Sequence, residues 1–363
     1  MQKKILIILE AGKINPSGIT RALIYRNLFK KNGYKCKFIN RNSSLLLHII
    51  INPPSILGFM NPRLTLNIAG KLNSIYSKIV HKYILKISEQ FDIVYTSKVQ
   101  DWDLIYKLKV VKKRRIVYDF GDSVWLFSNG QRFNEIISIV DTVTTDNKYV
   151  LDYVIKYNKN CVVIPDYPQL DIFDKLRVNS KKQKDKIVIG WIGSPTTLFN
   201  ISLIWDVIHF LFTKYNNIHL RLVGVGKNNF LFPDYSYIDY SIRPMYNQKQ
   251  MVEEVLNMDI GLFPLQNIES SVVRGVLKAS VYMCGAVPVI GSAMGEMNDF
   301  IQDGQNGFLA SNMDEWKTKL ELLIEDKSLR ERIGQNGLTT VRTSFSLDDN
   351  FDLLTKAFDK NLK

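Results

Sequence analysis

The chain has 363 residues, of which 46% are apolar, and it carries a formal net charge of +13 with no low-complexity run. This length suits about two domains of about 150 residues each. The N-terminus MQKKILIILEAG lacks the cleavage site of a signal peptide, and no apolar run approaches the about 20 residues of a membrane-spanning helix. Cys36, Cys161 and Cys284 are scattered and form no ligand pattern, so we expect buried thiols in a cytoplasmic protein.

The positive charge is concentrated in the first half of the chain. Residues 1–165 hold 26 Lys and Arg against 11 Asp and Glu, whereas residues 166–363 hold 22 against 24. A basic half can face nucleic acid, an anionic lipid surface or a polyanionic substrate, and it can equally be an ordinary solvated surface. The sequence offers no helix-turn-helix pattern and no aromatic RNA platform, so we expect no nucleic-acid partner.

The first 165 residues alternate short apolar runs with helical stretches. Lys4 to Leu9 is typical of a buried parallel strand, and the loop after it ends at Ser17 and Gly18, where a helix begins. Further strands are predicted at 36–40, 92–96, 115–118, 142–144 and 161–164. Asp119 and Asp122 follow the fourth of these six strands. Their carboxylates could accept a proton or a substrate hydroxyl, or they could cap a helix and bond loop amides.

Residues 45–86 form a distinctive segment of this half. An apolar run broken by two prolines precedes a helical stretch in which lysines recur at intervals of seven, four and four, at Lys71, Lys78, Lys82 and Lys86. Leu, Ile and Tyr lie between them. Such a helix could rest on an anionic membrane, or it could pack on the sheet as an ordinary amphipathic helix.

A second series of strands and helices follows a change in composition. Residues 166–186 are polar, rich in lysine and weakly periodic, which is typical of a linker. Strands are then predicted at IVIGWIG and HLRLVGVG, with a helix at about 197–215 between them. We therefore expect an α/β protein with two doubly wound, Rossmann-like domains facing each other across a cleft, at residues 1–165 and 187–346, and a final helix at 347–363.

Two glycine-rich strand ends indicate where the second domain could bind a ligand. Gly193 and Ser194 lie between a strand and a helix, where free backbone amides bind anions, although a plain tight turn has the same pattern. Gly224 and Gly226 end the next strand without the third glycine of a dinucleotide fingerprint, so we expect them to line the cleft.

The segment from Asp259 to Ser292 adds two cations to this edge of the sheet. It is predicted to run strand, loop, helix, strand, with Arg274 and Lys278 four residues apart on one helical face. Arg suits bidentate phosphate contact and Lys acts as a point charge, so the pair suits a diphosphate, although it could also be a solvated face. No Ser-His-Asp arrangement, phosphate loop or metal cluster occurs, so we expect no metal and no other cofactor.

Several motifs occur in the order found in a known family: IGWIGSPTT, LRLVGVG, MDIGLFPL, KASVYMCGAVPVIGSAMGE and IQDGQNGFLA. The chain resembles the GT-B glycosyltransferases of family 4, the "glycosyl transferases group 1", over nearly all of residues 187–346 and patchily before them. The resemblance implies that the final helix packs back on the N-terminal domain. It also implies a nucleotide-sugar donor whose diphosphate lies near residues of both domains, namely Ser17, Gly18, Gly193, Ser194, Arg274 and Lys278.

The resemblance also implies a function. The protein would transfer a sugar to a hydroxyl of a glycan or lipid-linked acceptor on the basic domain, with retained configuration and without a metal. The setting would be surface polysaccharide or glycoconjugate synthesis of the bacterial type, in the cytoplasm or at the inner face of its membrane. Relatives carry a histidine beyond an N-terminal strand, for which Asp119 is the nearest substitute here.

This sequence departs from the family pattern at two acidic positions. Many relatives have a pair of glutamates where Val273 and Val281 stand here, and a second register places Ser280 at the second position. The second glutamate normally contacts the ribose of the donor. Two alternatives therefore stay open: a non-catalytic nucleotide-sugar or glycan binder of the same fold, and a sugar-nucleotide epimerase.

Overall fold

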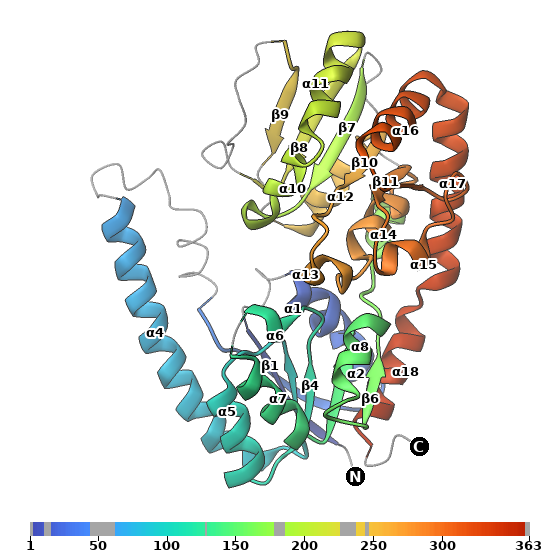
Figure 1. Cartoon of the computed structure of the whole chain (residues 1–363). Helices are drawn as coiled ribbons and strands as arrows, with labels where there is room; N and C mark the ends of the chain where they lie inside the picture. The colour runs from blue at the N-terminus through green and yellow to red at the C-terminus, as the bar shows by residue number, and fades with distance from the viewer. Residues whose placement is uncertain are drawn as a thin grey trace. The chain divides into compact units, whose positions relative to one another are not determined.

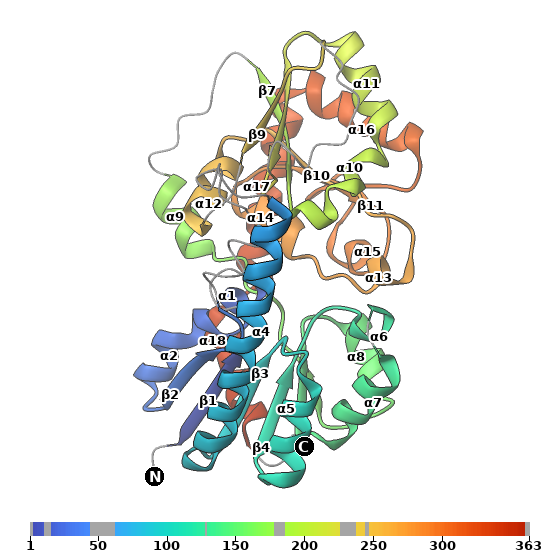
Figure 2. The ribbon, with the colours of Figure 1, turned by 90° about the vertical axis from the view of Figure 1, so that its left-hand side faces the viewer.

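The computed structural model describes residues 3–10, 16–43, 62–127, 129–177, 186–225, 237–243 and 247–359. The chain separates into two compact units: unit 1 comprises Met1–Asp166 and Leu347–Lys363, and unit 2 comprises Tyr167–Ser346. Within the described residues each unit contains one parallel six-stranded sheet flanked by helices (Figures 1 and 2). The predicted α/β class, with two Rossmann-like units, is therefore confirmed.

The sheet of unit 1 has the strand order β2-β1-β3-β4-β5-β6, and all of its pairs are parallel. Its strands are β1 (Lys4–Leu9), β2 (Lys35–Asn40), β3 (Ile93–Ser97), β4 (Arg115–Asp119), β5 (Thr142–Thr145) and β6 (Cys161–Val163). Nearly every residue of β1, β3 and β4 is buried. Because helices cover both faces of a parallel sheet, such strands are continuous apolar runs in the sequence, which is why they could be predicted.

Eight α-helices are described in unit 1: α1 (Pro16–Arg21), α2 (Arg26–Lys31), α4 (Pro62–Ile87), α5 (Trp102–Tyr106), α6 (Val124–Phe127), α7 (Gly130–Ile139), α8 (Lys148–Val154) and α18 (Leu347–Ala357). One-turn 3₁₀ helices at Leu23–Tyr25 and Ser88–Gln90 and a π-helical turn at Lys107–Val111 extend some of them. Helix α18 packs into the core of unit 1, where the ring of Phe351 lies edge-on to that of Phe29 at a centroid distance of 5.1 Å.

The sheet of unit 2 has the strand order β12-β11-β10-β7-β8-β9, again with parallel pairs. Its strands are β7 (Ile187–Ile192), β8 (Ile218–Val223), β9 (Tyr240–Arg243), β10 (Ile260–Phe263), β11 (Val289–Ser292) and β12 (Phe308–Ala310). The chain runs outward from β7 through β8 to β9 and then returns to β10 on the other side of β7. The carboxyl ends of β7 and β10 therefore flank the topological switch point, the usual ligand site of such a sheet.

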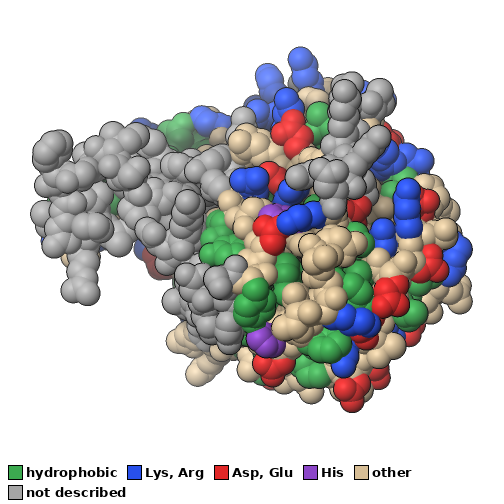
Figure 3. Space-filling view, turned by 90° about the horizontal axis from the view of Figure 1, so that it is seen from above, with side chains coloured by type: hydrophobic (Ala, Val, Ile, Leu, Met, Phe, Trp, Pro, Cys, Tyr) green, Lys and Arg blue, Asp and Glu red, His purple; other side chains and the backbone are tan. Residues whose placement is uncertain are grey.

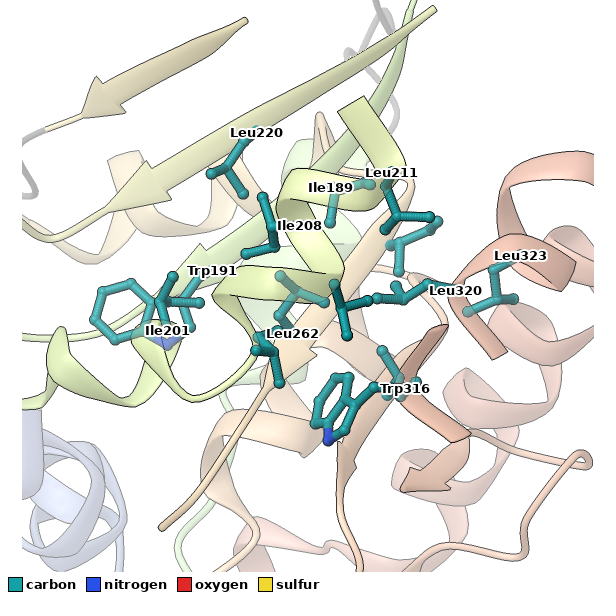
Figure 4. Packing of buried hydrophobic residues seen from close by; sticks show 14 of the residues in the cluster. Ile189, Trp191, Ile201, Ile208, Leu211, Leu220, Leu262, Trp316, Leu320 and Leu323 are labelled. Carbon is teal, nitrogen blue, oxygen red and sulfur yellow. The ribbon is translucent and has the colours of Figure 1, made fainter. Parts of the chain in front are cut away.

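The helices of unit 2 are α9 (Leu170–Arg177), α10 (Phe199–Ser202), α11 (Trp205–Lys214), α12 (Gln248–Leu256), α13 (Glu269–Val272), α14 (Leu277–Cys284), α15 (Glu296–Phe300), α16 (Met313–Glu325) and α17 (Lys327–Ser344), with a 3₁₀ turn at Pro195–Thr197. Helices α10, α11 and α16 close one face of the sheet with a large apolar cluster that includes Trp191, Ile208 and Trp316 (Figure 4). Helix α17 lies against α14, because Gly334 and Gly337 carry no side chain where it approaches the end of α14.

Three features of unit 2 differ from the sequence-based predictions. Helix α9 lies inside the predicted linker, residues 178–185 of which are outside the described part of the chain. The helix predicted at 197–215 is broken after Ser202, with a bend of 64° between its two parts. The edge strands β9 and β12, with four and three residues, were not predicted.

Among the described residues, no single helix is long and apolar enough to cross a membrane, whereas the bent pair Pro195–Ser202 and Trp205–Lys214 together has sufficient length and apolar composition. Both members of that pair contribute buried side chains to the core of unit 2.

Candidate functional site

Two glycines bring the first two loops at the carboxyl edge of unit 2 into direct backbone contact. Gly193 follows β7, and its amide donates a hydrogen bond to the Val223 carbonyl at 3.0 Å. Gly224 follows β8 with φ at +93°, and a Cβ atom there would lie only 1.9 Å from the Gly193 carbonyl oxygen. Glycine is therefore required at position 224, both by its backbone conformation and by the space available. Gly226, predicted to line the cleft, is outside the described residues.

Ser194 begins the helical segment that follows β7. Its amide donates to Thr197 Oγ1 at 3.2 Å, and its carbonyl accepts from the Thr197 amide at 2.9 Å, so the turn is closed by its own groups. The hydroxyls of Ser194 and Thr196 lie 2.8 Å apart, and both residues are exposed. These two hydroxyls, at the start of a helical segment, can donate to the oxygens of an anion.

The ammonium group of Lys278 lies over two aromatic rings near the carboxyl ends of β7 and β10. Its Nζ lies 4.7 Å from the ring centroid of Trp191 at the end of β7 and 5.1 Å from that of Phe263 at the end of β10. The same Trp191 ring would be 2.2 Å from a Cβ at Gly193. The indole therefore lies close to both the Gly193 turn and the ammonium group, which places the cation at the switch point.

The surroundings of Lys278 disfavour its charge. Burial against the rings, and to a lesser extent the positive charge of Arg274, lower the pKa of Lys278 to about 7. No acidic partner of its ammonium group is recorded among the described residues. A cation held in this way is stabilised when an anion binds next to it.

Arg274 has a different position from the predicted one. It does not lie on the helix of Lys278: α13 ends at Val272, α14 begins at Leu277, and Arg274 is in the exposed turn between them. The helix is interrupted because two amides do not make the hydrogen bonds of a continuous α-helix. The Arg274 amide donates to the Ser271 carbonyl at 3.1 Å, and the Val276 amide donates to Glu296 Oε2 at 3.0 Å. The predicted single helical face is therefore wrong, although the charge of Arg274 still acts on Lys278.

The positions at which the family resemblance predicts glutamates are buried in this structure. Val273 is 9% exposed and Val281 is 6% exposed. Ser280, the candidate of the second register, is fully buried, and its hydroxyl donates to the Val276 carbonyl at 3.0 Å. None of these three side chains presents a carboxylate to a ligand.

Asp119 in unit 1 has a structural role that replaces the predicted catalytic one. It is 0% exposed and accepts two hydrogen bonds from Arg21 Nε, at 2.8 and 2.9 Å, and a third contact from Arg21 Nη2 at 2.5 Å. The hydroxyls of Ser97 and Thr144 also donate to it, at 3.2 and 2.6 Å. With both oxygens occupied and no surface in solvent, this carboxylate is not placed to take a proton from a substrate, and we revise that prediction.

The other predicted residues of unit 1 lie around the ends of its strands. Asp122 is exposed, and its Oδ2 is 2.7 Å from Lys98 Nζ. Gly18 is buried in the first turn of α1, which follows β1 along the chain. The backbone of Ser17 belongs to the same turn, whereas its side chain is outside the described part of the structure.

Two residues at these sheet edges were missed by the sequence analysis. The sequence predicts Trp191 only as part of a strand, although its place two residues before Gly193 indicates proximity to the turn. Asp146 follows β5 in unit 1 and is 8% exposed. Burial, followed by the negative charge of Asp166, raises the pKa of Asp146 well above its usual range. Its neighbours are Gly121, where a Cβ would lie 2.6 Å from the carboxyl group, and Asn147.

Comparisons with known proteins support the fold. No family model matches the chain. The capsular polysaccharide biosynthesis glycosyltransferase CapM of Staphylococcus aureus is 25% identical over 207 residues, a match that covers 53% of this chain and 53% of that protein. The matched region therefore spans about half the length of this curated relative.

Two solved structures are similar over nearly the whole chain. HepE of Anabaena, in complex with UDP-glucose, has a TM-score of 0.64 at 14% identity and covers 97% of this chain and 98% of its own. A glycosyltransferase from Rickettsia africae has a TM-score of 0.65 at 16% identity and covers 99% of this chain and 100% of its own. At these identities the likeness shows the fold, and the chain has the two-unit fold of the GT-B glycosyltransferases.

Proposed function

We propose that this protein is a glycosyltransferase that moves a sugar from a nucleotide-diphosphate donor to a hydroxyl of a glycan or lipid-linked acceptor. The observation that carries the proposal is the position of Lys278 on the rings of Trp191 and Phe263, beside the Gly193 turn at the switch point of unit 2. The GT-B fold and the likeness to a capsular polysaccharide glycosyltransferase support it.

In this proposal unit 2 binds the donor. Lys278 and Arg274 neutralise the diphosphate, and the hydroxyls of Ser194 and Thr196 donate to its oxygens. When the sugar is transferred, negative charge grows on the departing diphosphate, and the two cations stabilise it. We propose that these cations replace a metal in this role and that the configuration at the sugar carbon is retained.

The acceptor is proposed to bind unit 1, whose chain segment carries most of the net positive charge. Asp119 supports this unit from within by pairing with Arg21 at the ends of its strands. We place the reaction in the cytoplasm, at the inner face of the cytoplasmic membrane, in the synthesis of a surface polysaccharide or glycoconjugate. The similarity to CapM, a glycosyltransferase of capsular polysaccharide biosynthesis, supports the synthesis of a surface polysaccharide.

The first test is the melting temperature of the full chain with UDP, GDP, ADP, CMP or dTDP, and with the corresponding sugar conjugates. A ligand that binds the folded state raises the melting temperature by mass action. Selective stabilisation by one nucleotide identifies the donor, and release of that nucleotide in the presence of lipid or glycan extracts then measures transfer. No stabilisation at millimolar concentrations would contradict the proposed donor site.

Two variants test the phosphate contacts. Arg274→Ala and Lys278→Ala should each weaken binding of the selected nucleotide by about 10–100-fold, because a hydrogen bond to a charged group contributes about 1.5–3 kcal/mol. Arg332→Ala and Lys327→Ala, on exposed positions of α17, are the matched controls. Unchanged affinity in both site variants would refute the assignment of these cations.

A nucleotide-sugar binder without transferase activity is the second candidate, and the burial of Val273 and Val281 favours it. It predicts stabilisation by the nucleotide without consumption of the donor under any acceptor condition. Conversion of the donor sugar in the absence of an acceptor would instead identify an epimerase. Transfer of label from donor to acceptor excludes both alternatives.

A further inference from the structure

Helix α4 has two apolar faces, of which only one is buried. Its inner face contributes Ala69, Val80, Ile84 and Ile87 to the interior of unit 1, each at most 8% exposed. A second set of apolar side chains recurs at intervals of four, three and four residues and therefore forms a stripe along another side of the helix, about 110° around the axis from the inner face. Its members are exposed by 42, 48, 55 and 63%, in the order Ile68, Leu72, Ile75 and Ile79.

This exposed stripe is unusual within the described part of the chain. Of the 18 large apolar residues exposed there, six lie on α4. They are the four members of the stripe together with Tyr76 and Tyr83, which flank it and are 37 and 42% exposed. Single exposed apolar residues need no explanation, whereas several aligned on one helix mark an interaction surface. In both ribbon views the N-terminal half of α4 extends beyond the strands of unit 1 (Figures 1 and 2).

Polar contacts connect the side of α4 that lies away from the exposed stripe to the rest of unit 1. Arg41 Nη1 donates to Ser77 Oγ at 2.7 Å, and His81 Nδ1 lies 3.0 Å from Asp101 Oδ2. At 100° per residue, Ser77 and His81 are on the side of the helix away from the stripe. These contacts fix the rotation of α4 about its axis, so the stripe is directed outward by the fold.

The charges of α4 all have one sign. Its sequence contains no Asp or Glu, and four lysines, Lys71, Lys78, Lys82 and Lys86, are all exposed. The first three follow one edge of the stripe. Lys86 lies in line with the stripe itself, nearer the C-terminal end of the helix. By contrast, basic and acidic side chains are interspersed on the face of the molecule shown in Figure 3.

We infer that the exposed face of α4 is a docking surface for an anionic lipid bilayer, on which the helix lies parallel to the membrane plane. The apolar stripe enters the boundary between headgroups and acyl chains, and the lysines reach outward along their flexible stems to lipid phosphates. The inference deepens the proposed action on a membrane-bound acceptor and rests on that proposal only for its biological purpose.

The same pattern disfavours a second copy of the chain as the partner. A coiled-coil seam through Ile68, Leu72, Ile75 and Ile79 would continue with the same spacing onto Lys82 and Lys86. Two copies would then place lysines within the apolar seam, where no acidic residue of α4 could pair with them. A surface of anionic headgroups satisfies these charges and covers the stripe at the same time.

The test is flotation of the full chain with vesicles of phosphatidylcholine alone or with added phosphatidylglycerol. The variant Ile75→Gln/Ile79→Gln removes the two most exposed members of the stripe, at 55 and 63% exposure, and replaces them with a residue of high helix propensity. Leu322→Gln, on an exposed position of α16 with 45% exposure, is its matched control. Lys78→Gln/Lys82→Gln removes two charges, and Lys327→Gln is the corresponding control.

We expect the parent chain and both controls to float with phosphatidylglycerol vesicles and to bind much more weakly to neutral ones. Each double variant should partition at least about tenfold more weakly. The inference would be overturned if the double variants bound phosphatidylglycerol vesicles as strongly as the parent chain does. It would also be overturned if the parent chain did not bind these vesicles. A dimer in sedimentation that Ile75→Gln/Ile79→Gln dissociates, without vesicle binding, would assign the stripe to self-association instead. Nucleotide binding in the absence of lipid is measured on the same samples, so failure of the membrane surface is distinguishable from failure of the donor site.

Discussion

Replacement of Lys278 by methionine should stabilise the unliganded protein and weaken its binding of the diphosphate by about 10–100-fold. Lys278 is held against Trp191 and Phe263, and burial together with Arg274 lowers its pKa from an ordinary value of 10.5 to about 7. Its charged form is therefore disfavoured in the folded state. Methionine fills the same space, packs well on aromatic rings and has no charge to lose.

The magnitude of the stabilisation follows from the lowered pKa. A difference of about 3.5 between 10.5 and 7 corresponds to about 5 kcal/mol at about 1.4 kcal/mol per pH unit, which is an upper bound. Attraction between the ammonium and the two rings offsets about 1–2 kcal/mol of this destabilisation. The exposed part of the Lys278 side chain reduces it further, because that part stays hydrated. We therefore expect a gain of about 2 kcal/mol, or about 4–8 °C in the melting temperature of a unit of this size.

The pH dependence has a definite sign. Below about pH 7 Lys278 is charged in both the folded and unfolded chains, so its full cost to stability is present. Between pH 7 and 10.5 the folded chain releases the proton while the unfolded chain keeps it, and the cost decreases as the pH rises. The advantage of the methionine variant should thus be largest near pH 6.5 and small near pH 10.

The assay is differential scanning fluorimetry of the parent, Lys278→Met and the exposed control Lys327→Met across this pH range. Calorimetric titration with the selected nucleotide follows at pH 6.5 and 8.5. Because the diphosphate binds the charged lysine, affinity of the parent should fall about tenfold per pH unit above pH 7. Equal melting temperatures for Lys278→Met and the parent at pH 6.5, or affinity of the parent that is independent of pH, would refute the reasoning.

Three further substitutions test the framework of the two units. Asp119→Asn should destabilise unit 1 by about 3–5 kcal/mol, because Arg21 would remain buried without a full countercharge, and an unchanged urea-unfolding midpoint would contradict this. Gly224→Ala should cost at least about 2 kcal/mol in the same assay, since φ is +93° and the new methyl group would meet backbone. Gly70→Ala, with open space around it in α4, is the control and should be neutral or stabilising. Ala286→Gly should raise the stability by up to about 1 kcal/mol, because Ala286 has φ at +53°, and a lower melting temperature would show that this strain is absent.

The parts of the fold that sequence reasoning identified correctly depend on local patterns. Strands such as β1 and β10 are apolar on both faces and end at glycine, proline or acidic residues, which makes them visible as short runs. The parts it missed depend on distant partners. Strand β9 is a half-buried edge with weak alternation, and the break before α11 follows from packing of Ile201 and Ile204 into the core of unit 2.

The candidate site shows the same division. Gly193 was predicted from its place after a strand, and Lys278 from its residue type on a helix between two strands; their contact with a donor stays a prediction. The predicted position of Arg274 was wrong, because the turn before α14 is closed by the Glu296 carboxylate, which accepts from the Val276 amide 20 residues earlier in the chain. The role of Asp119 was also wrong, since its partner Arg21 is 98 residues away and no local pattern links them.

The sequence by itself determined the class of the protein: two series of alternating strands and helices, glycines at strand ends and a pair of cations at one edge. Backbone conformation at a turn and the burial of a strand on both faces constrain residues that are neighbours in the chain. These features are therefore visible as local patterns of residue types. Only the tertiary structure decided that Trp191 and Phe263 hold Lys278, because the three side chains come from β7, β10 and α14. It also decided which apolar face of α4 is buried, since periodicity defines the faces of a helix but not the neighbour that each one meets.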